Sequence, residues 1–156
     1  MTPDNTLIFG HDEKVAAWVA RQLPHVGSAG FGPCRAIAVL AADKPVAGIV
    51  YHDYSPVHGV CQISMASTSP FWAKPQTIMD LLAVPFLQYR CRKVWTCIPS
   101  DNERAIRFNY GIGMVREAVL RHHFGHKRAA WVFGMMADEY TKLCERLARR
   151  AMKEAA

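Results

Sequence analysis

The stretch Asn102-Glu-Arg-Ala105-Ile-Arg-Phe108-Asn109-Tyr-Gly111-Ile-Gly113-Met-Val-Arg-Glu117-Ala-Val-Leu-Arg121 decides how the rest of the chain is interpreted. An asparagine at its start is suited to cap a helix, because its side-chain oxygen can accept a free backbone N–H. The two glycines are suited to end that helix. The residues after Gly113 predict a strand that carries an acidic residue and an arginine. The stretch therefore predicts a loop, a short helix and a strand in close succession.

Length and composition set the outer limits. The chain has 156 residues, of which 51% are hydrophobic and 21% are charged, which predicts one globular domain over residues 1–156. The longest apolar runs, such as residues 36–42, are far shorter than the ~20 residues of a membrane span. The first residues do not have the pattern of a basic and then apolar leader. We therefore expect a cytoplasmic protein with no membrane partner.

Five cysteines form no Cys-x-x-Cys pair, and their odd number argues against a disulfide framework. We expect reduced, mostly buried thiols and no bound metal. The histidines of residues 122–126 have no carboxylate or cysteine at ligand spacing beside them. A net charge of +6 favours an anionic partner without naming it. The sequence leaves the oligomeric state open, with a homodimer among the alternatives.

Hydrophobic periodicity and turn residues predict the order of elements. Helices are expected at residues 12–23, 77–89, 102–110 and 138–155, and Asp12 is expected to cap the first of them. Strands are expected at residues 35–40, 45–51, 59–66, 94–98, 114–124 and 129–136, with a short first strand at 7–9. Residues 24–33, with three glycines, are expected to form a lid or a connector. This order suits an α/β domain whose mixed, mostly antiparallel sheet of six or seven strands has helices on both faces.

Residues 102–121 resemble the second half of a GNAT-type acyl-CoA N-acyltransferase, and the predicted order of elements is that of the GNAT fold. The family pattern there is Asn-x-x-Ala/Ser, an aliphatic pair, Gly-Phe, then Glu-Gly and an Arg one strand later. Residues 62–78, Gln-Ile-Ser-Met-Ala-Ser-Thr-Ser-Pro-Phe-Trp-Ala-Lys-Pro-Gln-Thr-Ile, resemble a form common in ribosomal-protein-type N-terminal acetyltransferases. That form is Glu-Ile-Gly-Tyr-Trp-Leu, a Pro-containing turn, and Trp-Gly-Arg-Gly-Tyr-Ala-Thr.

The resemblance implies acetyl-CoA as co-substrate, with pantetheine against a splayed strand and the pyrophosphate at the start of the following helix. The positions that it implies for cofactor binding are Met65, Ser67, Ala73, Lys74, Gln76, Thr77 and Asn102. This chain departs from the pattern in the turn, where Ala73 and Pro75 replace glycines. Since proline lacks a donor and alanine adds a methyl group, we expect weakened or shifted pyrophosphate contacts, partly compensated by Lys74.

The family's usual acid and base are both replaced. Gln62 stands where the family has the glutamate that acts as general base, and a glutamine cannot take a proton at neutral pH. Asn109 stands where the family has the tyrosine that acts as general acid. The candidates that remain for acid–base work are Tyr110, Glu117 and His123, with His122 and His52 as further alternatives. His122 and His123 are expected on opposite faces of a strand, so that at most one faces a cleft.

The resemblance implies an N-acyltransferase that transfers acetyl from acetyl-CoA to a primary amine acceptor, on a small molecule or on a protein N-terminus. An alternative is a GNAT-fold binding or interaction protein that has lost catalysis, which would account for the changes at Gln62, Ala73, Pro75 and Asn109. In a third reading, a basic stripe on the last helix contacts nucleic acid, but such a stripe more often faces solvent. Nucleic acid is therefore the least favoured partner.

Overall fold

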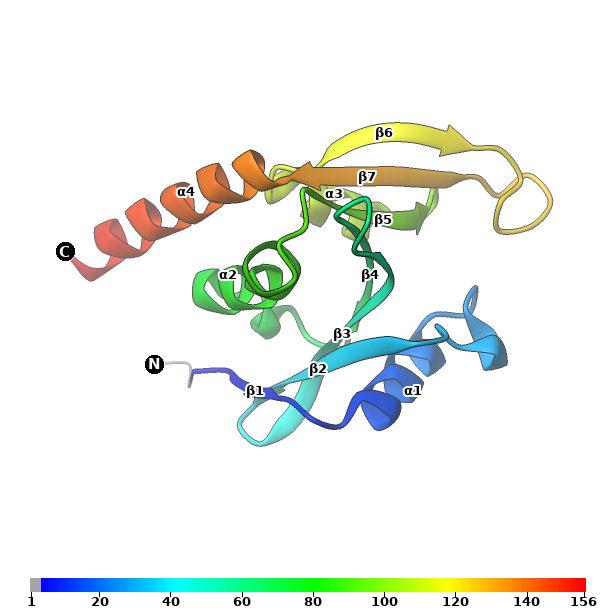
Figure 1. Ribbon diagram of the computed structural model, residues 1–156. Helices are drawn as coiled ribbons and strands as arrows, with labels where there is room; N and C mark the ends of the chain where they lie inside the picture. Colours follow the sequence, from blue (N-terminus) through cyan, green and yellow to red (C-terminus); the bar gives the residue numbers. More distant parts are fainter. Residues whose placement is uncertain (1–3) are drawn as a thin grey trace.

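A computed structural model describes residues 4–156, so residues 1–3 of the expected domain lie outside the described part. Seven strands form one sheet in the order β1-β2-β3-β4-β5-β7-β6 (Figure 1). Neighbouring strands are antiparallel except for β4 and β5, which are parallel. The predicted mixed, mostly antiparallel sheet is therefore confirmed.

The strands are β1 (Thr6–Ile8), β2 (Cys34–Ala41), β3 (Lys44–Ser55), β4 (Val60–Ser67), β5 (Lys93–Pro99), β6 (Val115–Leu120) and β7 (Ala130–Met136). The α-helices are α1 (Asp12–Gln22), α2 (Pro75–Ala83), α3 (Glu103–Gly111) and α4 (Ala137–Ala155). Short 3₁₀ turns lie at Gly27–Ala29 and Pro70–Trp72, and a π-helical turn spans Val84–Gln88. All four predicted helices and all seven predicted strands are present.

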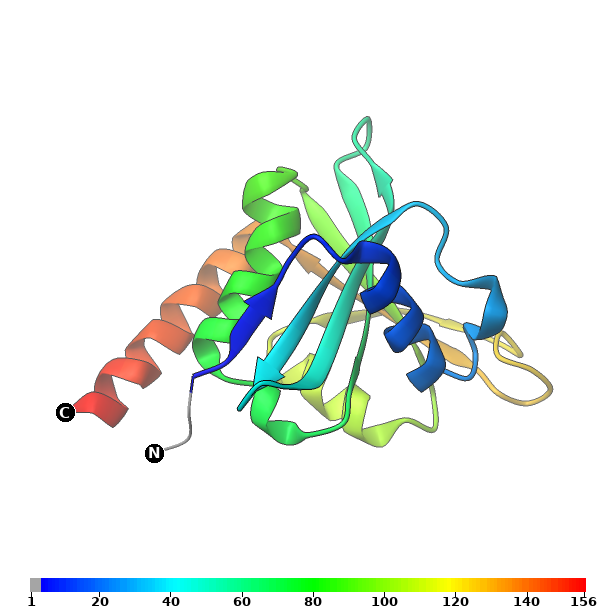
Figure 2. The ribbon, with the colours of Figure 1, turned by 90° about the horizontal axis from the view of Figure 1, so that it is seen from below.

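Helix α1 covers one face of the sheet (Figure 2). Its buried residues Val15 and Val19 pack against Ala36, Val50 and Ala66 of the strands below. The helix lies so close to β3 that a Cβ atom on Gly48 would come within 2.7 Å of Val19 Cγ2. Helix α1 can therefore pack this closely on β3 only because residue 48 has no Cβ atom.

Helices α2 and α4 lie together on the opposite face, over the larger apolar core. The rings of Phe86 and Tyr140 stack with centroids 4.9 Å apart, and Tyr140 Oη donates a hydrogen bond to the Met79 carbonyl. Leu143 and Leu147 of α4 are buried in the same core. The two faces therefore have separate apolar cores, and the sheet lies between them.

Pro85 distorts the second half of the helix predicted at residues 77–89. Helix α2 ends at Ala83, and the chain continues as the π-helical turn, in which Tyr89 N–H donates to the Val84 carbonyl at 3.0 Å. Pro85 has no N–H to donate to the carbonyl of the preceding turn, so the hydrogen bonds move to a longer spacing.

The third strand extends beyond its predicted end at residue 51. His52 pairs with Gln62 of β4, and a bulge then separates His52 from Ser55. Residues 52–55 have the composition of a turn in the sequence, but pairing with β4 holds them in the sheet. This extension places His52 and Asp53 in the lining of the second cavity described below.

The strand predicted at residues 114–124 is also too long. Strand β6 ends at Leu120, and a turn follows in which His122 and Lys127 have positive φ angles of 56° and 58°. Lys127 N–H donates to His122 Nδ1 at 2.8 Å, so this ring closes the turn. His122 and His123 therefore do not alternate across a strand as expected.

Asp12 is not the cap of α1. His11 precedes the helix, and the Asp12 carboxylate accepts from Ala36 N–H at 2.9 Å and from Arg35 at 3.4 Å. The carboxylate thus joins the first turn of α1 to β2. This role depends on a strand that lies more than twenty residues further along the chain, so local sequence could not reveal it.

Candidate functional site

The central feature of the sheet is the divergence of β4 from β5. Within residues 4–156, these strands pair only where Val60, Cys61 and Gln62 face residues 93–95. Beyond Gln62 the strands separate, so the edge of β4 that would otherwise pair with β5 is open to a ligand. An open strand edge offers backbone donors and acceptors to a ligand that can lie along it.

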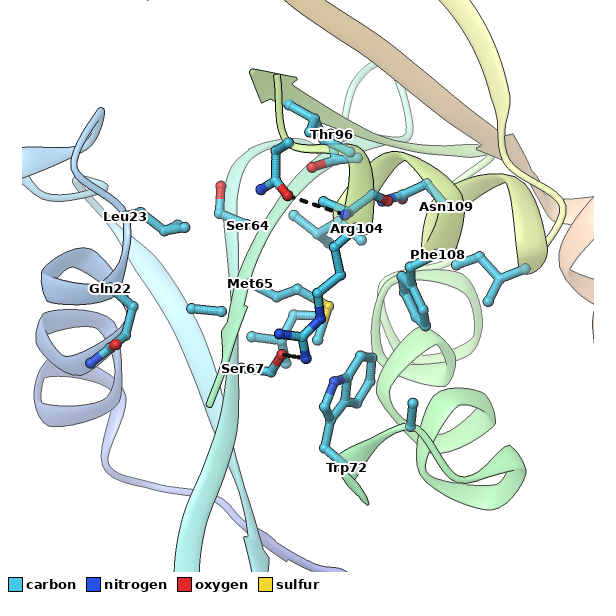
Figure 3. Close-up of a pocket in the computed structure, with 18 of the residues that line it drawn as sticks. Gln22, Leu23, Ser64, Met65, Ser67, Trp72, Thr96, Arg104, Phe108 and Asn109 are labelled. Carbon is cyan, nitrogen blue, oxygen red and sulfur yellow. Dashed lines mark hydrogen bonds between the residues drawn. The ribbon is translucent and has the colours of Figure 1, made fainter. Parts of the chain in front are cut away.

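A cavity of about 470 Å³ occupies this divergence (Figure 3). One wall is formed by residues 64–67 of β4 and the other by residues 96–99 of β5. Helix α3 and the Trp72 turn close one side, and the end of α1 contributes Gln22 and Leu23. The volume lies in the range of small-molecule and cofactor sites, which is about 300–1,000 Å³.

The cavity walls are mainly apolar, with a few polar groups from different elements. Asn102 caps α3, as the sequence predicts, since its Oδ1 accepts from Ala105 N–H at 3.2 Å. Asn109 is buried, and its side-chain amide donates to the Ala105 carbonyl at 2.7 Å. Arg104 extends from α3 across the cavity, with its guanidinium 3.4 Å from Ser67 Oγ (Figure 3).

The turn after β4 brings part of the expected cofactor set to the cavity. Trp72 is buried and packs on Phe108, with ring centroids 5.0 Å apart. Pro75 is the first residue of α2 and Lys74 precedes it. Of the residues that the resemblance implies for cofactor binding, Met65, Ser67, Ala73 and Asn102 line the cavity, whereas Lys74, Gln76 and Thr77 do not.

Gln76 and Thr77 have hydrogen-bond partners outside the cavity. Gln76 is exposed and bonds to Asp80 one turn later at 2.7 Å. Thr77 is buried, and its hydroxyl accepts from the amide of Asn5 at 3.0 Å. Asn5 also donates to the Trp72 carbonyl, at 2.9 Å. The amino-terminal segment thus covers the polar groups of this turn.

A second, more polar cavity of about 250 Å³ lies on the α1 face of the sheet. It shares His25, Ser64 and Cys97 with the first cavity, so the two meet in the divergence between β4 and β5. Its remaining lining comes from the loop after α1, the end of β3, β4 and the turn after β6: Val26, Gly30, Phe31, His52, Asp53, Gln62, His123 and Phe124. Because the two cavities adjoin, we treat them as one candidate site and call it the passage.

The loop after α1 and the turn after β6 meet at the mouth of the second cavity. The rings of His25 and Phe124 lie 4.6 Å apart. Burial, followed by the charges of Arg128 and His123, lowers the pKa of His25, which favours the neutral ring. Burial raises the pKa of the Cys97 thiol, which disfavours its thiolate. The residues where the cavities meet are thus mostly uncharged.

The three predicted acid–base candidates lie in different places. His123 lines the second cavity. Tyr110 lines neither cavity; its ring is half-exposed and packs edge-on against Phe133 at 5.1 Å. Glu117 lines neither cavity and pairs with Lys93 beside Gly134 at the far end of β5. Only His123 is therefore brought to the passage.

Two polar residues of the passage escaped the sequence reasoning. Ser64 stands where the family pattern has glycine, and it lines both cavities. The period-two alternation of β4 places it on the same face as Gln62, a signal that could have found it. Arg104 lies two residues after the capping asparagine, but nothing local shows that it faces β4. It becomes visible only once β4 and α3 are placed together.

Among the described residues, no helix is long and apolar enough to cross a membrane. Within the same part of the chain, no three His, Cys, Asp or Glu side chains are grouped as metal ligands.

Solved structures of acetyltransferases resemble this chain. A T. thermophilus protein designated an acetyltransferase is 25% identical to this chain, with a TM-score of 0.65. The match covers 76% of this chain and 67% of the T. thermophilus chain. A second protein with the same designation has 25% identity and a TM-score of 0.67 over 76% of this chain, which spans only 65% of that protein. A point mutant of the Vibrio cholerae spermidine N-acetyltransferase SpeG is 13% identical to this chain, with a TM-score of 0.69. The match covers 87% of this chain and 95% of the SpeG chain.

The sequence matches no protein-family model and no curated protein. The structural matches confirm the GNAT-like fold that the sequence predicts, with its seven-stranded, mostly antiparallel sheet and four α-helices.

Proposed function

We propose that this protein is an N-acetyltransferase that transfers acetyl from acetyl-CoA to a primary amine, on a small molecule or on a protein N-terminus. The observation that carries the proposal is the passage through the β4–β5 divergence, with one cavity on each side. A thioester arm entering from the larger cavity and an amine entering from the smaller one would meet beside Ser64 and Cys97. Direct transfer requires such an encounter, because holding both reactants in place supplies much of the rate enhancement.

The larger cavity suits the cofactor in shape and chemistry. Its apolar walls and the open edge of β4 fit a narrow pantetheine arm, whose amides can pair with backbone groups. Arg104 supplies a positive charge beside Ser67, close to where the arm would leave the cavity. In this proposal, the phosphates lie between Arg104 and the turn at residues 72–75. The replacement of glycines by Ala73 and Pro75 shifts the phosphates away from the backbone of that turn.

Two arginines on α3 provide a matched test. Arg104 and Arg107 are both exposed, but only Arg104 lines the cavity. Arg104→Ala should weaken acetyl-CoA binding by about 1 kcal/mol or more, roughly fivefold or greater, since charge-assisted hydrogen bonds contribute about 1.5–3 kcal/mol when well formed. Arg107→Ala removes the same charge and should leave affinity within about twofold, which titration calorimetry can measure.

Transfer to an amine is the second readout. The wild-type protein is incubated with acetyl-CoA and a panel of an alkyl monoamine, a polyamine, an aromatic amine and a peptide with a free α-amine. Thiol release that depends on the amine, with a matching acetylated product, would support the enzyme. Tight acetyl-CoA binding without transfer to any member would instead favour the catalytically inactive binding protein. No binding at millimolar acetyl-CoA would contradict both.

A further inference from the structure

His52 occupies a position that neither the resemblance nor the proposed cofactor site explains. His52 is only 6% exposed although it borders the second cavity. Nδ1 lies 2.6 Å from Asp53 Oδ2, and Nε2 lies 2.8 Å from Ser64 Oγ. The Phe31 ring packs against it with centroids 5.0 Å apart. The imidazole is therefore held in one orientation by three neighbours.

These contacts fix the tautomer of the neutral ring. A carboxylate can only accept hydrogen bonds, so His52 Nδ1–H donates to Asp53. In the neutral imidazole, Nε2 then carries the lone pair and accepts from the Ser64 hydroxyl. A serine, a histidine and an aspartate in this order are the arrangement in which a histidine takes a proton from a hydroxyl.

The sheet builds this arrangement through register and a local distortion. His52 pairs with Gln62 and Val50 pairs with Ser64, so Ser64 lies diagonally across from His52 on the α1 face. Consecutive strand residues normally point to opposite faces, but the bulge after His52 interrupts the alternation. Asp53 adopts a positive φ of 48°, and its carboxylate reaches the ring of the preceding residue. Such a backbone costs about 1–3 kcal/mol, and strain of this kind gathers at functional sites.

The position of Ser64 connects this group to the proposed reaction. Ser64 lines both cavities, at the point where a thioester and an amine would meet, and its hydroxyl is hydrogen bonded to His52. The titratable groups that face His52 from the surrounding elements are Asp53, Cys34 of β2, Cys97 of β5, His25 and His123. Among them, only Asp53 is hydrogen bonded to the ring. Ser64 and His52 thus provide a hydrogen-bonded path for a proton, which begins where the two cavities meet.

We propose that Ser64 and His52 form a proton relay that deprotonates the acceptor amine, with Asp53 as a positioning residue; this inference rests on the proposed N-acetyltransferase function. The amine nitrogen attacks the thioester carbon, so that a C–N bond forms and the C–S bond breaks. The amine proton passes to Ser64 Oγ while the Ser64 proton passes to His52 Nε2. His52 returns its proton to solvent and the CoA thiolate takes one up, so the products are an amide and a thiol.

The relay fills the place left by Gln62. Gln62 borders the same cavity but cannot accept a proton at neutral pH. His52 pairs with Gln62 across the two strands, so in this proposal the base lies one strand away from its usual position. The relay requires no covalent acyl-enzyme, because Ser64 passes a proton and does not attack the thioester.

The test compares variants of the relay with variants of a similar pair outside the passage. His52→Gln, Ser64→Ala and Ser64→Thr change the relay. Ser55→Ala and His58→Gln change a Ser–His pair of 2.9 Å at the end of the same strand, which lines neither cavity. For each variant, acetyl-CoA affinity is measured by calorimetry and kcat/KM is measured with the amine panel.

His52→Gln should lower kcat/KM by about 10²–10⁴-fold, the usual contribution of a general base, with acetyl-CoA affinity nearly unchanged. Ser64→Ala should also reduce it, whereas Ser64→Thr keeps a hydroxyl and should retain most of the activity. The defect of His52→Gln should shrink for a weakly basic aromatic amine, because such an amine loses its proton to water more readily. A purely structural role for His52 would not produce this dependence on the acceptor.

Three results would overturn the relay. The first is a His52→Gln or Ser64→Ala protein that remains folded and transfers acetyl within a few-fold of wild type. The second is an intact mass increased by one acetyl group, localised to Ser64, after incubation with acetyl-CoA alone, since this would make Ser64 a nucleophile. The third is a wild-type protein that acetylates no amine, which removes the proposed function as well. In the first two results the proposed function survives.

Discussion

The packing of α1 on β3 gives a quantitative prediction for Gly48→Ala. The new Cβ would lie 2.7 Å from Val19 Cγ2 and 3.4 Å from Val15 Cγ1, and Val19 is fully buried. Real Cβ atoms do not approach a carbon as closely as 2.7 Å, so the helix or the strand must shift. Overpacking of this kind costs about 1–3 kcal/mol. For a chain of this length, each kcal/mol lowers Tm by about 2–4 °C.

The assay is urea unfolding followed by fluorescence, with a double-mutant cycle. Val19→Ala alone should cost roughly 1.5–3 kcal/mol through lost burial and the space that it leaves. In Gly48→Ala/Val19→Ala the new methyl group enters that space, so the double variant should be more stable than the sum of the single effects by about 1 kcal/mol.

Gly111→Ala is the matched control. A Cβ there would meet nothing within 4 Å, and the residue ends α3 without a positive φ. This change should be neutral or stabilising by up to about 1 kcal/mol. Gly48→Ala as stable as wild type, or strict additivity in the cycle, would refute the close packing of α1 on β3.

Three further predictions concern the passage. Asn102→Ala should lower the free energy of unfolding by about 1 kcal/mol, measured by urea unfolding, because the N–H of Ala105 loses its acceptor. Burial raises the pKa of Cys97, so iodoacetamide should alkylate this thiol more slowly than a free thiol near neutral pH, and faster as the pH rises. Bound acetyl-CoA should protect Cys97 from alkylation. An alkylation rate that acetyl-CoA does not change would argue against occupancy of the passage. Replacing both Ala73 and Pro75 with glycine should tighten CoA binding in calorimetry, because the phosphates could then approach the backbone of this turn; unchanged affinity would place the phosphates elsewhere.

The features that sequence predicts well are those set by neighbouring residues. The cap at Asn102 and the end of α3 near Gly111 depend on side chains within one turn, so the pattern at residues 102–113 predicts them directly. The alternation of β3 and β4 likewise depends on local periodicity. The resemblance carried by these segments predicts the GNAT-like fold, which the solved structures confirm.

The features that sequence misses depend on register or on distant partners. The bulge that turns Asp53 onto His52 exists only because β3 continues to pair with β4 beyond residue 51. Arg104 reaches Ser67 only when α3 packs beside the end of β4. Glutamate is a residue type that often acts as a catalytic base, but Glu117 pairs with Lys93, at the end of β5 that is remote from the passage. Residue type alone could not separate it from a base at the site.

The central claim is that a thioester lies between the diverging strands β4 and β5. A crystal structure of the protein with acetyl-CoA tests it most directly. The prediction is that the pantetheine follows the open edge of β4, the acetyl group lies beside Ser64 and Cys97, and Arg104 contacts the phosphates. Acetyl-CoA bound elsewhere on the surface, or strands closed together with no room for the arm, would contradict the claim.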